Sequence, residues 1–196
     1  MSFKFRLTFE VIKFPANCEF ALIEAMSSAG AKASITADTA EGLGKGLVDV
    51  EVVTGDGVVV NALTALTTAI SAAQSVLSDD ANLHEVSPDI ADRSSLAAWL
   101  GIQQSSLQRY VSKSWWPPGM VNGKCWRVDD VVEALLLNTR VKIDNATSLI
   151  RAARAARVVN ARLAAEKCCV SAEEVMSTLT PAKQRVSPVM RYLESR

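Results

Sequence analysis

The sequence predicts an α+β protein made of an α/β sandwich, a small unit of short helices with a hairpin, and a long helical region. Residues 3–11 alternate apolar and polar side chains, and this period of two is typical of a half-buried strand. Gly101 separates two short helical patterns, and residues 131–167 contain neither glycine nor proline. The composition, with 49% hydrophobic and 21% charged residues among 196, is typical of a soluble globular chain of one or two domains.

The first 88 residues predict an antiparallel sheet with two helices on one face. The expected elements are a strand over 3–12, a helix over 17–30, a short strand over 32–36, a strand over 47–53, a helix over 61–77 and a strand over 82–86. Gly42, Gly44 and Gly46 indicate a loop before the third strand, and the valines at 58–60 fit either strand or helix. The order β-α-β-β-α-β is that of a ferredoxin-like sandwich, which we expect over residues 1–88 in a regulatory or dimerisation role.

Two short helices joined by a tight turn are predicted next. Ser94 or Ser95 can cap the first helix, because a side-chain oxygen there accepts an unpaired amide of the first turn. Gly101 supplies the backbone conformation that ends it, and the second helix runs over residues 103–113. The residues that we assign to the small core are Leu96, Trp99, Leu107, Tyr110 and Trp126.

A hairpin and a third helix follow. The prolines at 117 and 118 cannot continue the second helix, since proline lacks the amide hydrogen. Asn122-Gly123 is expected to form the two-residue turn of a small hairpin. Asp129 or Asp130 then opens a helix rich in Val, Ala and Leu. Helix, turn, helix, small wing, helix is the plan of a winged helix-turn-helix.

The segments LAAWLGIQQSSLQRYV and WPPGMVNGKCWRVDDVVEAL resemble those of a known class of DNA-binding domain. In order and spacing they are similar to the "LA..LGV…S…RYV" and "FPPPV…GG..RW…DVVEWL" segments of MerR-type and AlpA/excisionase-type domains. The resemblance covers about residues 89–137 and implies a winged helix-turn-helix over 89–140 that binds double-stranded DNA. Gln103 stands where a small capping hydroxyl is usual, and Gln104 where many relatives have a basic residue, so base preference is not carried over.

Under this resemblance, the helix over 103–113 would enter the major groove and the 122–123 hairpin would reach the minor groove. Exposed amides, hydroxyls and cations supply the donors and acceptors that base edges and phosphates need. The halves of the chain also differ in charge, since residues 1–88 carry net −6 and residues 89–196 net +6. The predicted DNA-binding residues are Gln103, Gln104, Ser105, Ser106, Gln108, Arg109, Lys113, Asn122, Lys124 and Arg127.

Residues 141–196 predict a long helix and a helical tail for dimerisation or partner binding, with a break near Asp144 or Asn145 before the long helix. The spacing of one apolar stripe on this helix is that of a coiled-coil seam. We favour a seam that joins two copies, and the alternative is a helix that packs back onto the N-terminal domain. Its arginines at 151, 154 and 157 would form a solvated face or contact the DNA backbone. The predicted dimerisation residues are Leu149, Ala152, Ala156, Val159 and Leu163.

Nothing in the sequence favours an enzyme, a cofactor or a metal site. The single histidine, His84, has no nucleophile placed beside it by spacing, and Asp129-Asp130 is typical of helix-end charges. The four cysteines lack the spacing of a zinc site, so we expect reduced thiols. No apolar run is long enough to cross a bilayer and the N-terminus lacks a signal-peptide core, which predicts a cytoplasmic, nucleoid-associated protein.

The leading hypothesis is therefore a homodimeric, sequence-specific DNA-binding protein, either a transcriptional regulator or an excisionase-like factor. A second hypothesis is a protein-interaction or assembly module that keeps the winged-helix shape without binding DNA, with a further protein partner on the C-terminal helices. A third, compatible with the first, is a regulator whose N-terminal sandwich holds a small-molecule effector.

Overall fold

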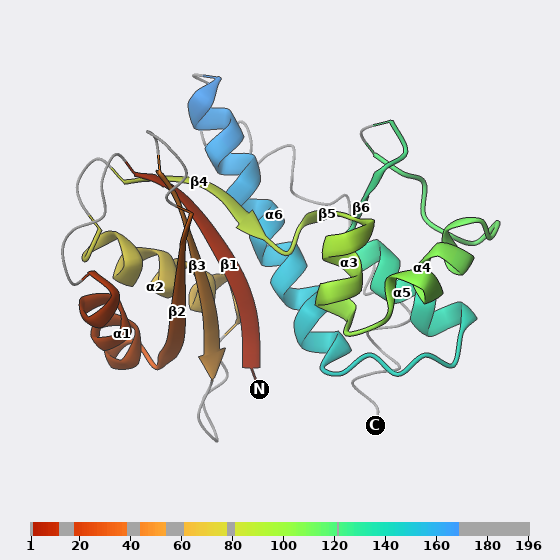
Figure 1. Cartoon of the computed structure of the whole chain (residues 1–196), viewed down its shortest axis with the longest axis horizontal. Coiled ribbons are helices and arrows are strands. Elements are labelled where there is room, and N and C mark those ends of the chain that lie inside the picture. Colours follow the sequence, from red (N-terminus) through yellow and green to blue (C-terminus); the bar gives the residue numbers. More distant parts are fainter. Residues whose placement is uncertain are drawn as a thin grey trace.

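The chain is a mixed α+β protein with small antiparallel sheets (Figure 1). The computed structural model describes residues 2–11, 18–38, 44–53, 61–77, 81–120 and 122–168. Our expectations for valines 58–60 and for the tail beyond 168 lie outside these residues.

The N-terminal unit is a four-stranded antiparallel sheet whose strand order is β2-β3-β1-β4. Its strands are β1 (Ser2–Val11), β2 (Ala31–Asp38), β3 (Gly44–Val53) and β4 (Asn82–Ser87). The predicted order β-α-β-β-α-β is present along the chain. Gly44 and Gly46 belong to β3, where they pair with Val11 and Phe9, so the expectation of a loop at these two glycines was wrong. β3 extends through Gly44 and Gly46 because β1 is long enough to pair with them.

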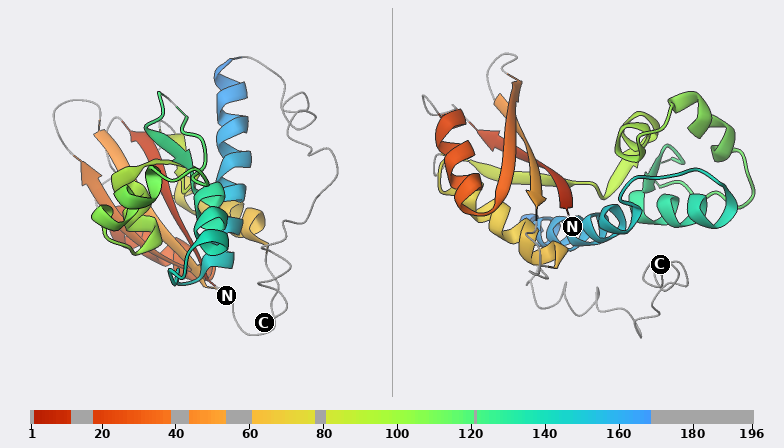
Figure 2. Two further views of the ribbon diagram at one scale, coloured as in Figure 1. Left: turned by 90° about the vertical axis from the view of Figure 1, so that its right-hand side faces the viewer. Right: turned by 90° about the horizontal axis from the view of Figure 1, so that it is seen from below.

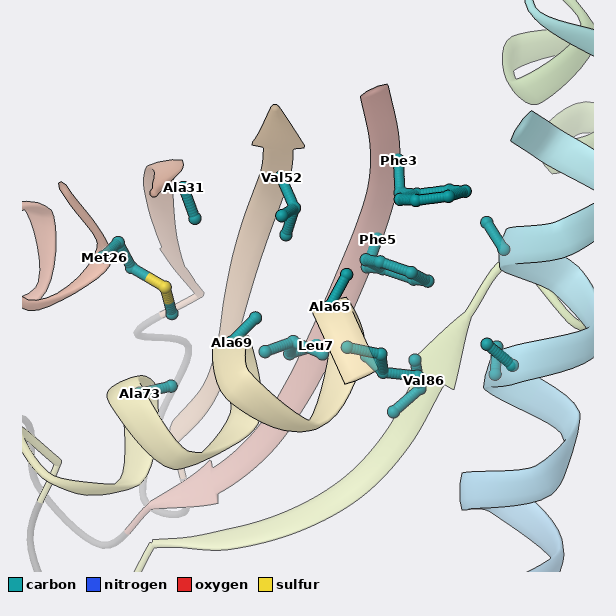
Figure 3. Packing of buried hydrophobic residues seen from close by; sticks show 14 of the residues in the cluster. Phe3, Phe5, Leu7, Met26, Ala31, Val52, Ala65, Ala69, Ala73 and Val86 are labelled. Atoms are coloured by element: carbon teal, nitrogen blue, oxygen red, sulfur yellow. The ribbon is translucent and has the colours of Figure 1, made fainter. Parts of the chain in front are cut away.

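Among the described residues, three helices cover one face of this sheet, where two were expected. α1 (Cys18–Ser28) contacts β2, α2 (Ala62–Gln74) contacts β1 and β3, and α6 (Ala146–Lys167) contacts β1 and β4. The alternation of β1 sends its apolar side chains to this face, and Phe3 and Phe5 point toward α6 (Figure 3). The polar side chains of β1 therefore occupy the opposite face.

A second unit, residues 89–138, is called the helix–hairpin unit below. Its elements are β5 (Ile90–Asp92), α3 (Arg93–Leu100), α4 (Gln104–Val111), β6 (Cys125–Arg127) and α5 (Val128–Asn138). β5, which the sequence did not predict, pairs antiparallel with β6. Leu96, Leu107 and Trp126 are buried in its core as expected, while Trp99 and Tyr110 are partly buried against it.

α6 belongs to both units (Figures 1 and 2). Ala152 and Ala156 lie in the core of the N-terminal unit, with Val159 and Leu163 packed against it, and Leu149 lies in the core of the helix–hairpin unit. Of the five residues predicted as a dimer seam, three are buried and two are half-buried within their own chain, so the alternative of packing back is the observed one. Small alanines permit this, since they let a helix approach a sheet closely. The predicted break is present, because Asn145 adopts a left-handed conformation (φ 55°) just before α6.

Within the described ranges, no helix combines the length and apolar character needed to cross a membrane. The same residues hold no cluster of three or more His, Cys, Asp or Glu side chains suited to a metal ion. Cys18, Cys125 and Cys168 are free thiols.

Candidate nucleic-acid interface

The turn between α3 and α4 has well-defined ends. Asp92, not Ser94 or Ser95, caps α3, and its Oδ1 accepts the Ser95 amide at 2.8 Å. This backbone hydrogen bond is the main reason that the pKa of Asp92 lies below its usual value. Gly101 ends α3 at φ 64°, as expected, and the following amide of Ile102 donates to the carbonyl of Ala97 at 3.1 Å. The turn thereby sets α4 across α3.

α4 buries little and exposes polar side chains. Leu107 is its fully buried residue, and Tyr110 and Val111 are partly buried against the core. Gln103 is the N-cap but makes no side-chain capping hydrogen bond. The exposed residues of the predicted set at this helix are Gln103, Gln104, Ser105, Gln108, Arg109 and Lys113. Ser106 is half-buried, and its Oγ accepts from the Arg109 guanidinium at 3.3 Å.

A chain of aromatic rings connects α4 to the hairpin. The centroids of Tyr110 and Trp115 are 5.8 Å apart, those of Trp115 and Trp116 6.1 Å, and those of Trp116 and Trp126 5.9 Å. Such spacings allow tilted and edge-to-face contacts, each contributing about 0.5–1.5 kcal/mol beyond burial. Because Trp126 lies on β6, these rings fix the base of the hairpin relative to α4.

The hairpin differs in its turn from the prediction. Met120 and Cys125 exchange backbone hydrogen bonds of 2.7 and 3.2 Å, so the loop spans 121–124 and not two residues. Asn122 (φ 58°) and Gly123 (φ 73°) still take the left-handed conformations that an Asn-Gly pair favours. Gly119 packs against Gly123 so closely that a Cβ on residue 119 would lie 2.6 Å from the Gly123 Cα.

The predicted hairpin residues occupy two positions. Asn122 and Lys124 are exposed at the tip, whereas Arg127 is half-buried on β6, where its backbone pairs with Ile90. Arg127 is also the N-cap residue of α5, so neither Asp129 nor Asp130 opens that helix. Of the predicted cations, Arg127 therefore lies at the base of the hairpin and Lys124 at its end.

Three carboxylates of the helix–hairpin unit contact α6. Asp89 and Asp129 are buried, and Glu133 is partly buried. Arg154 of α6 contacts Glu133 at 2.7 Å and Asp129 at 3.4 Å. Arg157 pairs with Asp129 and approaches Asp89 at 3.5 Å. Arg154, which is exposed, and Arg157, which is half-buried, thus pair with carboxylates of the helix–hairpin unit instead of forming an unpaired solvated face.

This network also reaches the sheet. The side-chain amide of Asn160 accepts from the Val86 amide and donates to the Val86 carbonyl, both at 2.8 Å, and it donates to Asp89 at 3.0 Å. Sequence reasoning missed Asp89, Asp129 and Asn160 as a group. An aspartate in a first helical turn has an ordinary local explanation, and nothing local indicates a partner on another helix.

The segment from residue 93 to residue 128, which forms α3, α4 and the hairpin, carries only positive formal charges, and the exposed carboxylate of Asp92 lies just before it. The chain contains no Asp or Glu between residues 93 and 128. The cations of this segment are Arg93, Arg109, Lys113, Lys124 and Arg127. In the first turn of α5, Asp130 has a pKa raised first by desolvation and then by the neighbouring charge of Asp129.

The sole histidine takes part in surface contacts. Lys167 lies 3.0 Å from the Nδ1 of His84, and a Glu10 carboxylate oxygen lies 3.4 Å from the same nitrogen. These contacts join β4 to β1 and to the end of α6.

No protein-family model, curated protein or solved structure matches this chain.

Proposed function

We propose that the chain binds double-stranded DNA, with the helix–hairpin unit acting as a winged helix-turn-helix of the MerR/AlpA type. The observation that carries the proposal is the separation of charge within this unit. Its buried carboxylates are neutralised by arginines of α6, while α4 and the hairpin expose cations, amides and hydroxyls without any carboxylate. A phosphate-rich duplex would meet attraction along α4 and the hairpin.

In this proposal, α4 enters the major groove. Gln104 and Ser105 in its first turn, with Gln108 and Arg109 in its second, are exposed and offer donors and acceptors to base edges. The 3.3 Å contact of Arg109 with Ser106 is long, so its guanidinium can exchange this contact for a guanine. Lys113 and Lys124 would contact phosphates on either side.

The N-terminal unit fits a ferredoxin-like plan, to which α6 adds a third helix. The β-α-β-β-α-β order and the sheet order β2-β3-β1-β4 support this assignment. We infer that the unit acts as a regulatory or dimerisation domain of a homodimeric transcriptional regulator or excisionase-like factor.

The decisive experiment is a fluorescence-anisotropy titration against a randomised duplex pool at about 50 mM and about 200 mM salt, followed by sequencing of the bound fraction. We expect salt-sensitive binding and an enriched inverted repeat. Arg109→Ala should weaken binding to that site by about 1–3 kcal/mol. Arg162→Ala is the matched control, because Arg162 is an exposed arginine of α6 paired with Glu166. Absence of binding at the lower salt concentration would overturn the proposal.

A second candidate is a protein-interaction module that uses the same surface. The observation that favours it is that α4 carries a single cation, Arg109. In that case the duplex titration would show no binding, and Arg109→Ala would instead weaken a protein complex.

A further inference from the structure

The two edges of the N-terminal sheet are protected differently. At the β4 edge, Asn160 bonds both backbone groups of Val86, so its amide occupies the place of a neighbouring peptide. α6 runs beside this strand (Figure 3). At the opposite edge, β2 pairs with β3 alone among the strands of the described residues. β2 is thus the edge at which another strand can add.

β2 is neither short, bulged nor interrupted by proline, and its two charged residues are of opposite sign. Natural edge strands are short, bulged, interrupted by proline or rich in charge. β2 spans eight residues, AKASITAD, pairs with β3 in an uninterrupted register and contains no proline. Its backbone donors and acceptors on the outer side therefore form a regular row for strand addition.

The sequence of β2 is complementary to itself in the antiparallel direction. When two copies pair about Ile35, Lys32 of one copy falls opposite Asp38 of the other, and the same pair recurs on the other side of the two-fold axis. Ala33 falls opposite Ala37, and Ser34 opposite Thr36. Opposite charges directly across an antiparallel pair stabilise it, whereas like charges destabilise it.

The helix next to this edge presents apolar side chains to solvent. α1 packs against β2 with its Cys18, Leu22 and Met26 side. On its other side Phe20 is 77% exposed and Ile23 42% exposed. α1 and β2 lie at the same end of the molecule, away from the helix–hairpin unit (Figures 1 and 2). A partner that continued the sheet at β2 would bring its own α1 to this end.

We propose that two copies of this chain associate through β2, which pairs antiparallel about Ile35 to give one continuous sheet, with the α1 helices on the same side. This isologous contact closes into a two-fold dimer. It replaces the α6 seam, whose residues pack into or against the cores of their own chain. The interface stands whether or not the protein binds DNA.

The test is a charge-swap cycle read by analytical ultracentrifugation over a range of concentrations. We expect the full-length chain to dimerise, and Lys32→Asp or Asp38→Lys to raise the dimer Kd by about tenfold, because each change creates two like-charged pairs. The double variant K32D/D38K should restore the original Kd. Lys4→Asp is the control, because Lys4, like Lys32, lies across from Glu51 but on a central strand.

If Lys32 and Asp38 acted only within each chain, the dimer Kd of the variants would follow their melting temperatures. Inside each chain Lys32 lies across from Glu51, and Asp38 across from Lys45, so the double variant carries both unfavourable pairs. Its melting temperature should fall below that of either single variant while its dimerisation recovers. A chain that stays monomeric at every concentration, or a double variant with a Kd weaker than those of the single variants, would overturn the proposal. Phe20→Ser should raise the Kd without lowering the monomer's melting temperature, because Phe20 is exposed.

Discussion

The sequence predicts both α4 and α6 as helices, but the two differ in how much of their surface the rest of the chain covers. α4 spans eight residues, fully buries only Leu107 and turns its polar residues to solvent. α6 spans 22 residues and buries side chains in two separate cores. The difference shows that an apolar stripe predicts that a helix is covered but does not predict by what. A stripe with coiled-coil spacing served here to join two units of one chain.

The largest expected effect on stability comes from a substitution at a buried residue of α6. Ala156 is fully buried between α6 and the N-terminal sheet, so Ala156→Asp would place an unpaired charge there. We expect a loss of more than about 4 kcal/mol in unfolding free energy, measured by urea denaturation. Ser105→Asp on the exposed face of α4 should leave unfolding unchanged and weaken DNA binding. Equal destabilisation by the two changes would contradict the comparison.

The next largest effect concerns the ion-pair network. Asp129→Asn would leave Arg157, which is partly buried, with a weakened partner, and breaking such a pair typically costs about 3 kcal/mol. Urea denaturation at neutral pH is the measurement. If the variant lost less than about 1 kcal/mol, the network would be an incidental contact instead of the junction between units.

A smaller effect is expected at the cap of α3. Asp92→Ala should lower stability by about 1 kcal/mol at neutral pH, since the Ser95 amide loses its acceptor. The pKa of Asp92 is lowered in the folded chain, so its contribution is present above the ordinary value of 3.8 and is lost as the pH falls through the folded value. Wild type and variant should therefore converge in melting temperature in acid. Ser94→Ala is the control, because Ser94 is exposed and is not the cap.

The smallest effect has the opposite sign. Because the pKa of Asp130 is raised in the folded chain, its ionisation disfavours folding once the pH exceeds 3.8 and rises through the folded value. Asp130→Asn should therefore raise the melting temperature at neutral pH and leave it nearly unchanged in strong acid. A lower melting temperature at neutral pH would show that the carboxylate makes a favourable contact.

Much of the fold was predictable from local patterns. The alternation from Phe3 to Phe9 specified β1 and its buried face, and Gly101 specified the end of α3. Strand ends were less accurate, because β3 extends through Gly44 and Gly46 by pairing with β1. β5 was missed because three residues carry too little periodicity to be recognised before their partner β6 is known.

For the candidate interface, the sequence indicated which residues are exposed on α4 and which glycine and asparagine shape the hairpin. It did not indicate the loop length at 121–124, because the Met120–Cys125 pair depends on the close packing of Gly119 on Gly123. The capping role of Asp92 was also missed, since two serines nearby offered an equally good capping oxygen.

The sequence by itself determined the order of the elements, their apolar faces and the carboxylate-free segment between residues 93 and 128. Those properties depend on residues that are close along the chain, so backbone periodicity and side-chain type are enough to predict them. Only the tertiary structure decided that α6 contributes to both cores, that Arg154 and Arg157 pair with carboxylates of another unit, and that β2 is an edge strand among the strands that the structure describes. These features depend on contacts between residues far apart in sequence, which local preferences leave open.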